Sequence, residues 1–238
     1  MPDWAQVVLL ALFAGIAMPI GAALASIERL RPAWLEAEFR HGVIAFGGGA
    51  LLAAVALVLV PEGAQTLSLP IIALCFLAGA VGFMLLDILL ARRETAASQL
   101  VAMLTDFLPE ALALGAMLTE PGSAGLLLAS IIAVQNLPEG FNACRELRSS
   151  TAFSAVAIVV AFFAMALLGP LFGLFGFFVL VDYPSIVGGI MLFAAGGILY
   201  LIFQDIAPQA LLEKHWLPPL GAALGFFLGI AGKVLLEH

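Results

Sequence analysis

Long apolar runs, separated by short polar breaks, make up almost the whole chain. A helix that crosses a membrane needs about 20 mostly apolar residues. By that measure the sequence contains eight candidate spans, at residues 5–27, 42–61, 69–91, 98–118, 124–144, 152–180, 185–211 and 217–236. The breaks are short and rich in charged residues, Pro or Gly, and none is long enough to hold a second domain. The pattern predicts an all-α polytopic membrane protein, with residues 1–238 forming one domain of eight transmembrane helices.

Composition supports a bilayer as the surroundings of this chain. Of its 238 residues, 63% are hydrophobic and only 11% are charged, whereas a soluble domain has roughly a quarter charged residues. The first apolar run starts close to Met1 without a basic segment or a cleavage site, so it is interpreted as a span and not as a signal peptide. The net charge of −7 argues against a nucleic-acid partner, which requires a basic surface.

Basic residues are concentrated in alternate breaks. Eight of the nine lie in or beside the first, third, fifth and seventh breaks, and the even breaks contain none; the eight are Arg29, Arg31, Arg40, Arg92, Arg93, Arg145, Arg148 and Lys214. Loops rich in Lys and Arg stay on the cytoplasmic side of a membrane. We therefore expect the odd loops in the cytoplasm and both termini outside it, in a bacterial inner (plasma) membrane.

The fourth and fifth predicted spans carry a repeated polar pattern. It occurs once as "DFLPEA" at 106–111 and again as "QNLPEG" at 135–140. In each copy a polar residue precedes a Pro-Glu pair so that the polar residue and the Glu are four positions apart, which places both on one face of a helix. A single Pro-Glu pair is equally consistent with a simple kink, but two copies on consecutive spans indicate a shared polar site.

A charge at membrane depth costs about 2.5–3.5 kcal/mol even on the mildest scales. No Lys or Arg lies in the middle of a predicted span, so protons or a bound cation must neutralise the carboxylates there. Carboxylate and amide oxygens bind hard or borderline cations. The candidate metal ligands are Asp106, Glu110, Gln135, Asn136, Glu139 and Asp205. For Asp87, a solvated helix end is an equal alternative.

At these positions the chain resembles the ZIP (Zrt-, Irt-like protein) family of metal transporters, particularly its prokaryotic branches. The fourth helix of that family typically reads His-Asn-x-Pro-Glu-Gly, and the fifth helix carries a related motif. Its seventh helix has a Tyr, a His-Glu pair and a Pro, with the spacing found here in "YLIFQDIAP" at 200–208. The usual histidines are replaced in this chain by Asp106, Gln135 and Gln204.

The resemblance implies uptake of a divalent metal toward the cytoplasm by alternating access, with two helix bundles sliding past each other and the metal on the fourth and fifth helices. It implies no cofactor beyond the transported ion and leaves a homodimer open. Because imidazole is absent from the spans, an oxygen-only site shifts the expected substrate toward Mn²⁺, Fe²⁺ or Mg²⁺, although Zn²⁺ also binds carboxylates.

Other functions remain as alternatives. A ZIP-like permease of different selectivity, or a sensor that does not transport, would retain the same fold. An intramembrane enzyme would need an activated nucleophile, and the serines of the spans, Ser130 and Ser154, have no base beside them in the sequence. We therefore expect that the chain is not an enzyme.

The distribution of basic residues predicts the orientation of the chain. A Cys placed at Ser123, in an even break, should react with an impermeant thiol reagent added outside intact cells, whereas a Cys at Ser149 should react only after the membrane is opened. Labelling of the Ser149 position from outside would reverse the topology.

Overall fold

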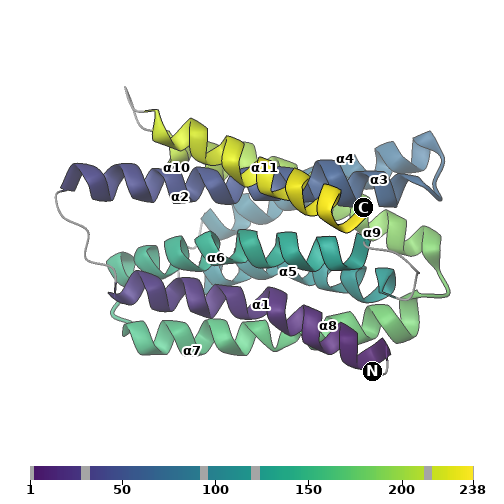
Figure 1. The fold of residues 1–238 in the computed structure, drawn as a ribbon, viewed down its shortest axis with the longest axis horizontal. Coiled ribbons are helices and arrows are strands. Elements are labelled where there is room, and N and C mark those ends of the chain that lie inside the picture. Colours follow the sequence, from purple (N-terminus) through teal and green to yellow (C-terminus); the bar gives the residue numbers. More distant parts are fainter. Residues whose placement is uncertain (1–2, 28–32, 92–95, 119–123, 212–215, 238) are drawn as a thin grey trace.

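The computed structural model describes residues 3–27, 33–91, 96–118, 124–211 and 216–237 (Figure 1). Among these residues all regular structure is helical, which confirms the predicted all-α class. Seven helical stretches of the described chain are long and apolar enough to cross a membrane: Asp3–Ile27, Glu38–Ala64, Leu69–Ala91, Ala124–Ser150, Ala155–Leu180, Pro184–Ala210 and Leu217–Leu235.

Five of the helices are uninterrupted over their length: α1 (Asp3–Ile27), α4 (Leu69–Ala91), α5 (Ala96–Met117), α6 (Ala124–Ser150) and α11 (Leu217–Glu237). Three further rods contain π-helical turns. They are α2–η1–α3 (Ala33–Ala54, Val55–Leu59 and Val60–Ala64), α7–α8–η2 (Ala155–Ala166, Leu168–Phe175 and Gly176–Leu180) and α9–η3–α10 (Pro184–Leu201, Ile202–Ile206 and Ala207–Ala210). Such turns are rare in proteins, and those that occur often lie at functional sites.

The predicted fourth span coincides with α5, which is not one of the seven stretches. At 1.5 Å per residue its 22 residues extend about 33 Å, the thickness of a hydrocarbon core. Two helices are longer than the hydropathy pattern predicted, because α2 already begins at Ala33 and α6 continues to Ser150. Polar residues with good helix propensity can continue a helix beyond its apolar part.

The helices form two groups that lie against each other (Figure 1). The first group contains α1, α5, α6, α7, α8 and η2, and the second contains α2, α3, α4, α9, α10, α11, η1 and η3. Within the first group α1 packs along α6 and α5 along α8; within the second α2 packs along α11 and α4 along α9. In Figure 1, α2, α4 and α11 form the upper layer, α1, α7 and α8 the lower layer, and α5 and α6 lie between them.

Glycines bring helix backbones into direct contact inside each group. A Cβ on Gly21 of α1 would lie 2.0 Å from the Leu137 carbonyl oxygen of α6, and one on Gly140 of α6 would lie 2.2 Å from the Met18 oxygen of α1. Gly49 and Gly225 make the same reciprocal contact between α2 and α11. Small residues permit such close packing of membrane helices, so each group is held together by its backbones.

Contacts across the boundary between the groups are looser. There a Cβ on Gly47 of α2 would meet only the ring of Pro138, at 3.1 Å, and one on Gly232 of α11 would meet a methyl of Leu127, also at 3.1 Å. At these two positions, the glycine of one group therefore meets a side chain of the other group and not its backbone.

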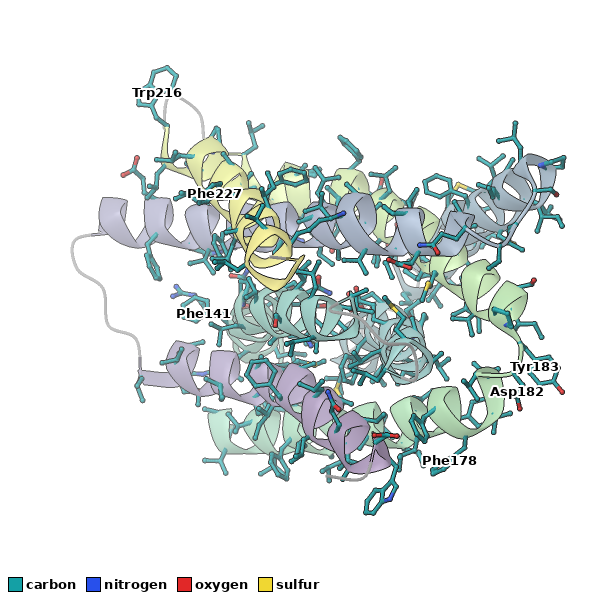
Figure 2. All side chains as sticks on the ribbon, turned by 45° about the vertical axis from the view of Figure 1, so that its right-hand side comes forward. Phe141, Phe178, Asp182, Tyr183, Trp216 and Phe227 are labelled. Atoms are coloured by element: carbon teal, nitrogen blue, oxygen red, sulfur yellow. The ribbon has the colours of Figure 1, made fainter. Side chains whose placement is uncertain are left out.

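Large apolar side chains cover the outside of both groups. Figure 2 shows Phe178 on η2 and Phe227 on α11 at the surface, where they are 62% and 60% exposed. Leu74 and Leu77 of α4 are similarly exposed. A soluble monomer rarely exposes apolar surface on this scale, so these faces suit the lipid surroundings that the sequence predicts.

The start of α1 and the end of α11 lie at the same end of the bundle (Figure 1), here called the termini end. The opposite end, where α2 begins and α6 ends, carries Arg40, Arg145 and Arg148 and is called the arginine end. The other basic residues of the odd breaks, together with Ser123, lie outside the described residues.

The backbone contact between α1 and α6 predicts the effect of enlarging Gly140. Gly140→Ala should lower the free energy of unfolding by about 1–3 kcal/mol, as other overpacked cores do, because the Met18 carbonyl cannot move without shifting α1. Gly42→Ala is the matched control, since its Cβ would lie 3.5 Å from the nearest atom, Leu217 Cγ. Thermal unfolding in detergent, followed by circular dichroism, measures both, and equal stabilities would contradict the proposed packing.

Candidate functional site

A cavity of about 120 Å³ lies between the two helix groups. The first group lines it with α5 and α6, and the second with α2, α9, η3 and α10. Its polar lining residues are Asp106, Gln135, Glu139, Asn142, Glu146, Asp205 and Gln209. Of the described residues that line it, none is Lys, Arg or His. The cavity is therefore acidic and large enough for a small cation with water around it.

Glu110 and Gln135 form a buried bridge between α5 and α6. The side chain of Glu110 is fully buried, and that of Gln135 is 1% exposed. The Nε2 atom of Gln135 donates to both carboxylate oxygens of Glu110, at 2.9 Å and 2.8 Å. Hydrogen bonds to a charged group contribute about 1.5–3 kcal/mol, so the amide compensates part of the cost of burying this carboxylate. Glu110 lies behind the cavity and is not one of its lining residues.

Three buried oxygens have no hydrogen-bond donor within the described part of the chain. They are Asp106 Oδ1, Gln135 Oε1 and Asn142 Oδ1, and all three residues line the cavity. A buried acceptor without a donor costs about 1–3 kcal/mol. Such oxygens normally have a partner in water or an ion, and the cavity provides space for either.

Glu139 and Asp205 bring carboxylates to the cavity from the two different helix groups. Glu139 lies on α6, close enough to Asp106, Glu110 and Asp205 for their charges to repel it. Asp205 lies in the π-helical turn η3, where its side chain is exposed and its Oδ1 accepts from Gln209 Nε2 at 2.6 Å. The neighbouring Gln204 is not among the lining residues.

Asn136 faces away from this cavity. Its side chain is 1% exposed, and its Nδ2 donates to the Ala14 carbonyl oxygen of α1 at 2.9 Å. Among the six candidate ligands, Asp106, Gln135, Glu139 and Asp205 line the cavity, Glu110 supports Gln135 from behind, and Asn136 joins α6 to α1. Over the described residues, no group of three or more His, Cys, Asp or Glu is placed to hold a metal, so any cation here would also need amide oxygens.

The structure adds three polar residues that the motifs did not identify: Asn142, Glu146 and Gln209. The sequence does hold a signal for two of them. Gln135, Glu139, Asn142 and Glu146 recur at intervals of four, three and four residues, the spacing of one helix face. This face of α6 forms a polar row that starts at the central cavity and runs toward the arginine end.

A second, wider cavity of about 400 Å³ continues this row to the arginine end. Arg40, Arg145 and Ser149 line it, together with Ile44, Asn142, Glu146 and Gln209, which it shares with the central cavity. Phe141, labelled beside α6 in Figure 2, lies one turn before Arg145, and its ring packs edge to face against Phe39 of α2, with 6.2 Å between ring centroids. The two cavities therefore adjoin each other at these four shared residues.

The opposite side of the central cavity is packed with apolar side chains. Leu59 of η1, Leu114 of α5, and Met191 and Ala195 of α9 are all buried in one cluster. Along their helices these residues lie on the termini-end side of the residues that line the cavity.

Asp87 has a partner of its own. The hydroxyl of Tyr200 donates to Asp87 Oδ2 at 3.0 Å, which joins α4 to α9 inside the second group. This bond stabilises a carboxylate in the apolar part of α4.

The contact of Asn136 with α1 predicts a structural role for this residue. Asn136→Leu should lower the free energy of unfolding by about 1–3 kcal/mol, because it removes the hydrogen bond from Nδ2 to the Ala14 carbonyl oxygen that joins α6 to α1. It should leave the affinity for Mn²⁺ unchanged, as judged by titration of the folded variant. A variant of normal stability that no longer binds Mn²⁺ would show instead that Asn136 is a ligand.

In comparisons with known proteins, no protein-family model matches the chain, and no curated protein matches it.

Proposed function

We propose that this chain is an integral membrane carrier that moves a divalent cation toward the cytoplasm through the cavity between its two helix groups. One observation carries the proposal. In an apolar bundle, one cavity is lined by Asp106, Gln135 and Asn142, whose buried oxygens have no donor among the described residues, and by carboxylates from both helix groups.

In this proposal α5 is an eighth span. Its length suffices, and its carboxylates do not face lipid, since Asp106 is 4% exposed and Glu110 is fully buried. Eight spans place both termini on one side of the membrane, in agreement with the positions of α1 and α11 in Figure 1. The basic residues at the arginine end then assign that end to the cytoplasm.

The charges around the cavity favour a divalent cation. When ionised, Asp106 and Glu139 would together supply two negative charges, which one divalent ion would balance. Carboxylate and amide oxygens suit Mg²⁺, Mn²⁺ or Fe²⁺, and Zn²⁺ remains compatible with carboxylates. Of the described residues that line the central cavity, none is Ser, Thr, Cys or His, which supports binding and release over nucleophilic chemistry.

The two helix groups supply a mechanism for alternating access. Glycines let helix backbones approach closely inside each group, whereas side chains form the boundary between the groups. Asp106, Gln135 and Glu139 belong to the first group, and Asp205 belongs to the second. Relative movement of the groups would change which end the cavity faces and separate Asp205 from the other three. This agrees with the sliding bundles expected from the resemblance to the ZIP family, to which we assign the chain on its motifs.

In the described conformation the cation would leave toward the cytoplasm. The wider cavity adjoins the central cavity on the side of the arginine end, while apolar side chains pack on the side of the termini end. Asn142 and Glu146 line both cavities, so they lie on the route of release.

The shared-cation proposal predicts the result of removing its carboxylates. Asp106→Asn and Glu139→Gln should each reduce Mn²⁺ uptake into proteoliposomes by at least about tenfold, because one cation needs both charges. The double variant should lose little more, since groups that act as one unit are not additive. Both changes are nearly isosteric and remove a buried charge, so the fold should survive.

Glu62→Gln is the matched control for this experiment. Glu62 lies in α3, where it accepts a hydrogen bond from Gln65, and it is not a lining residue of the cavity. Its uptake should equal that of the unmodified chain. Normal uptake by either single cavity variant would contradict a cation shared by Asp106 and Glu139.

A further inference from the structure

Asn142 holds a position that the repeated motif does not include. It lies three residues after Glu139 on α6, one turn closer to the arginine end. Its Oδ1 atom is enclosed and has no donor among the described residues, although the residue lines both the central cavity and the wider one. An amide oxygen of this kind is a neutral, hard donor.

The orientation of Gln135 is fixed by its neighbour. Because the Nε2 atom donates to both oxygens of Glu110, the Oε1 atom must point away from Glu110. That oxygen has no donor within the described chain, and Gln135 is 1% exposed. Glu110 therefore acts as a positioning residue that presents the Gln135 oxygen as an acceptor.

Asp106 supplies the third oxygen, from the other motif helix. Its side chain is 4% exposed, its Oδ1 has no donor in the described structure, and it lines the same cavity. Glu139 contributes a carboxylate whose charge lies close to that of Asp106. Two carboxylates and two amide side chains thus line one cavity, and with both acids ionised they would balance the charge of one divalent cation.

Building on the proposed function, we propose that Asn142 is a ligand of the transported cation and completes an oxygen-only set with Asp106, Gln135 and Glu139. It takes the place of Asn136, whose amide is used by α1. The site is then one turn closer to the cytoplasm than the motifs alone place it. Neutral amide donors and two charges suit a hard divalent ion such as Mn²⁺ or Mg²⁺ better than a soft one.

Binding of Mn²⁺ to the full-length chain in lipid nanodiscs tests this set, with free Mn²⁺ measured by electron paramagnetic resonance. Asn142→Leu should weaken binding by at least about tenfold, because it removes one oxygen donor while keeping the number and branching of the side-chain heavy atoms. Asn142→Asp should strengthen binding, because it adds a charged oxygen at the same position. A residue with only a structural role would not give opposite effects in these two variants.

Ser130→Ala is the control on the same helix. The Ser130 hydroxyl donates to the Leu126 carbonyl oxygen at 2.8 Å, and the residue lines a separate apolar cavity between α2, α6 and α11. Its Mn²⁺ affinity should equal that of the unmodified chain.

The outcomes separate this inference from the proposed function. If the unmodified chain binds Mn²⁺ and Asn142→Leu binds it equally well, the oxygen of Asn142 is satisfied by water and the inference is overturned, while the carrier proposal stands. If the unmodified chain shows no saturable binding of Mn²⁺, Mg²⁺, Fe²⁺ or Zn²⁺, both are overturned. Should Asn142→Leu not fold, Asn142→Asp decides, since unchanged or weaker binding by that variant contradicts a ligand role.

Discussion

The cost of keeping carboxylates inside an apolar bundle is the constraint on which the whole arrangement depends. Three acids of the described helices meet it differently. Glu110 is held by the amide of Gln135, Asp87 by the hydroxyl of Tyr200, and Asp106 has an oxygen with no donor in the described chain. Deep charges that persist in membrane helices usually face a cavity and mark an ion pathway, and Asp106 lies on such a cavity.

The two kinds of helix packing account for where this cavity forms. Where glycines allow backbones to touch, as between α1 and α6, there is no space for a site. Where the groups meet through side chains, polar residues of α6 face those of η3 and α10 across an open space. The π-helical turn η3 brings Asp205 to that boundary. Closely packed groups and a boundary formed by side chains are the properties that a carrier needs to expose one site to two sides in turn.

Much of the fold could be predicted because hydropathy reports directly on burial in lipid. Each predicted span coincides with a helical rod, but the extensions of α2 and α6 were not predicted, since helix propensity continues where hydropathy stops. The motif spacing predicted that Asp106, Gln135 and Glu139 share one polar site, and all three line the same cavity.

The rotation of α6 was harder to predict. Asn136 follows Gln135 directly in the sequence. That the Asn136 side chain faces α1 is known only from its hydrogen bond to the Ala14 carbonyl oxygen, 122 positions away in the chain. Likewise, the bond between Gln135 and Glu110 joins residues 25 positions apart, so it depends on tertiary packing. The position of Asn142 could have been predicted from the sequence, because this residue continues the polar face of α6.

Uptake of radioactive Mn²⁺ into proteoliposomes, in competition with Mg²⁺, Fe²⁺, Zn²⁺ and Ca²⁺, is the measurement that tests the carrier account most directly. The account predicts saturable uptake above that of protein-free liposomes. Small divalent ions that bind oxygen ligands should compete more strongly than Ca²⁺, because Ca²⁺ prefers more oxygen ligands than the four proposed residues supply. Uptake no faster than in protein-free liposomes, for every ion of the panel, would contradict it.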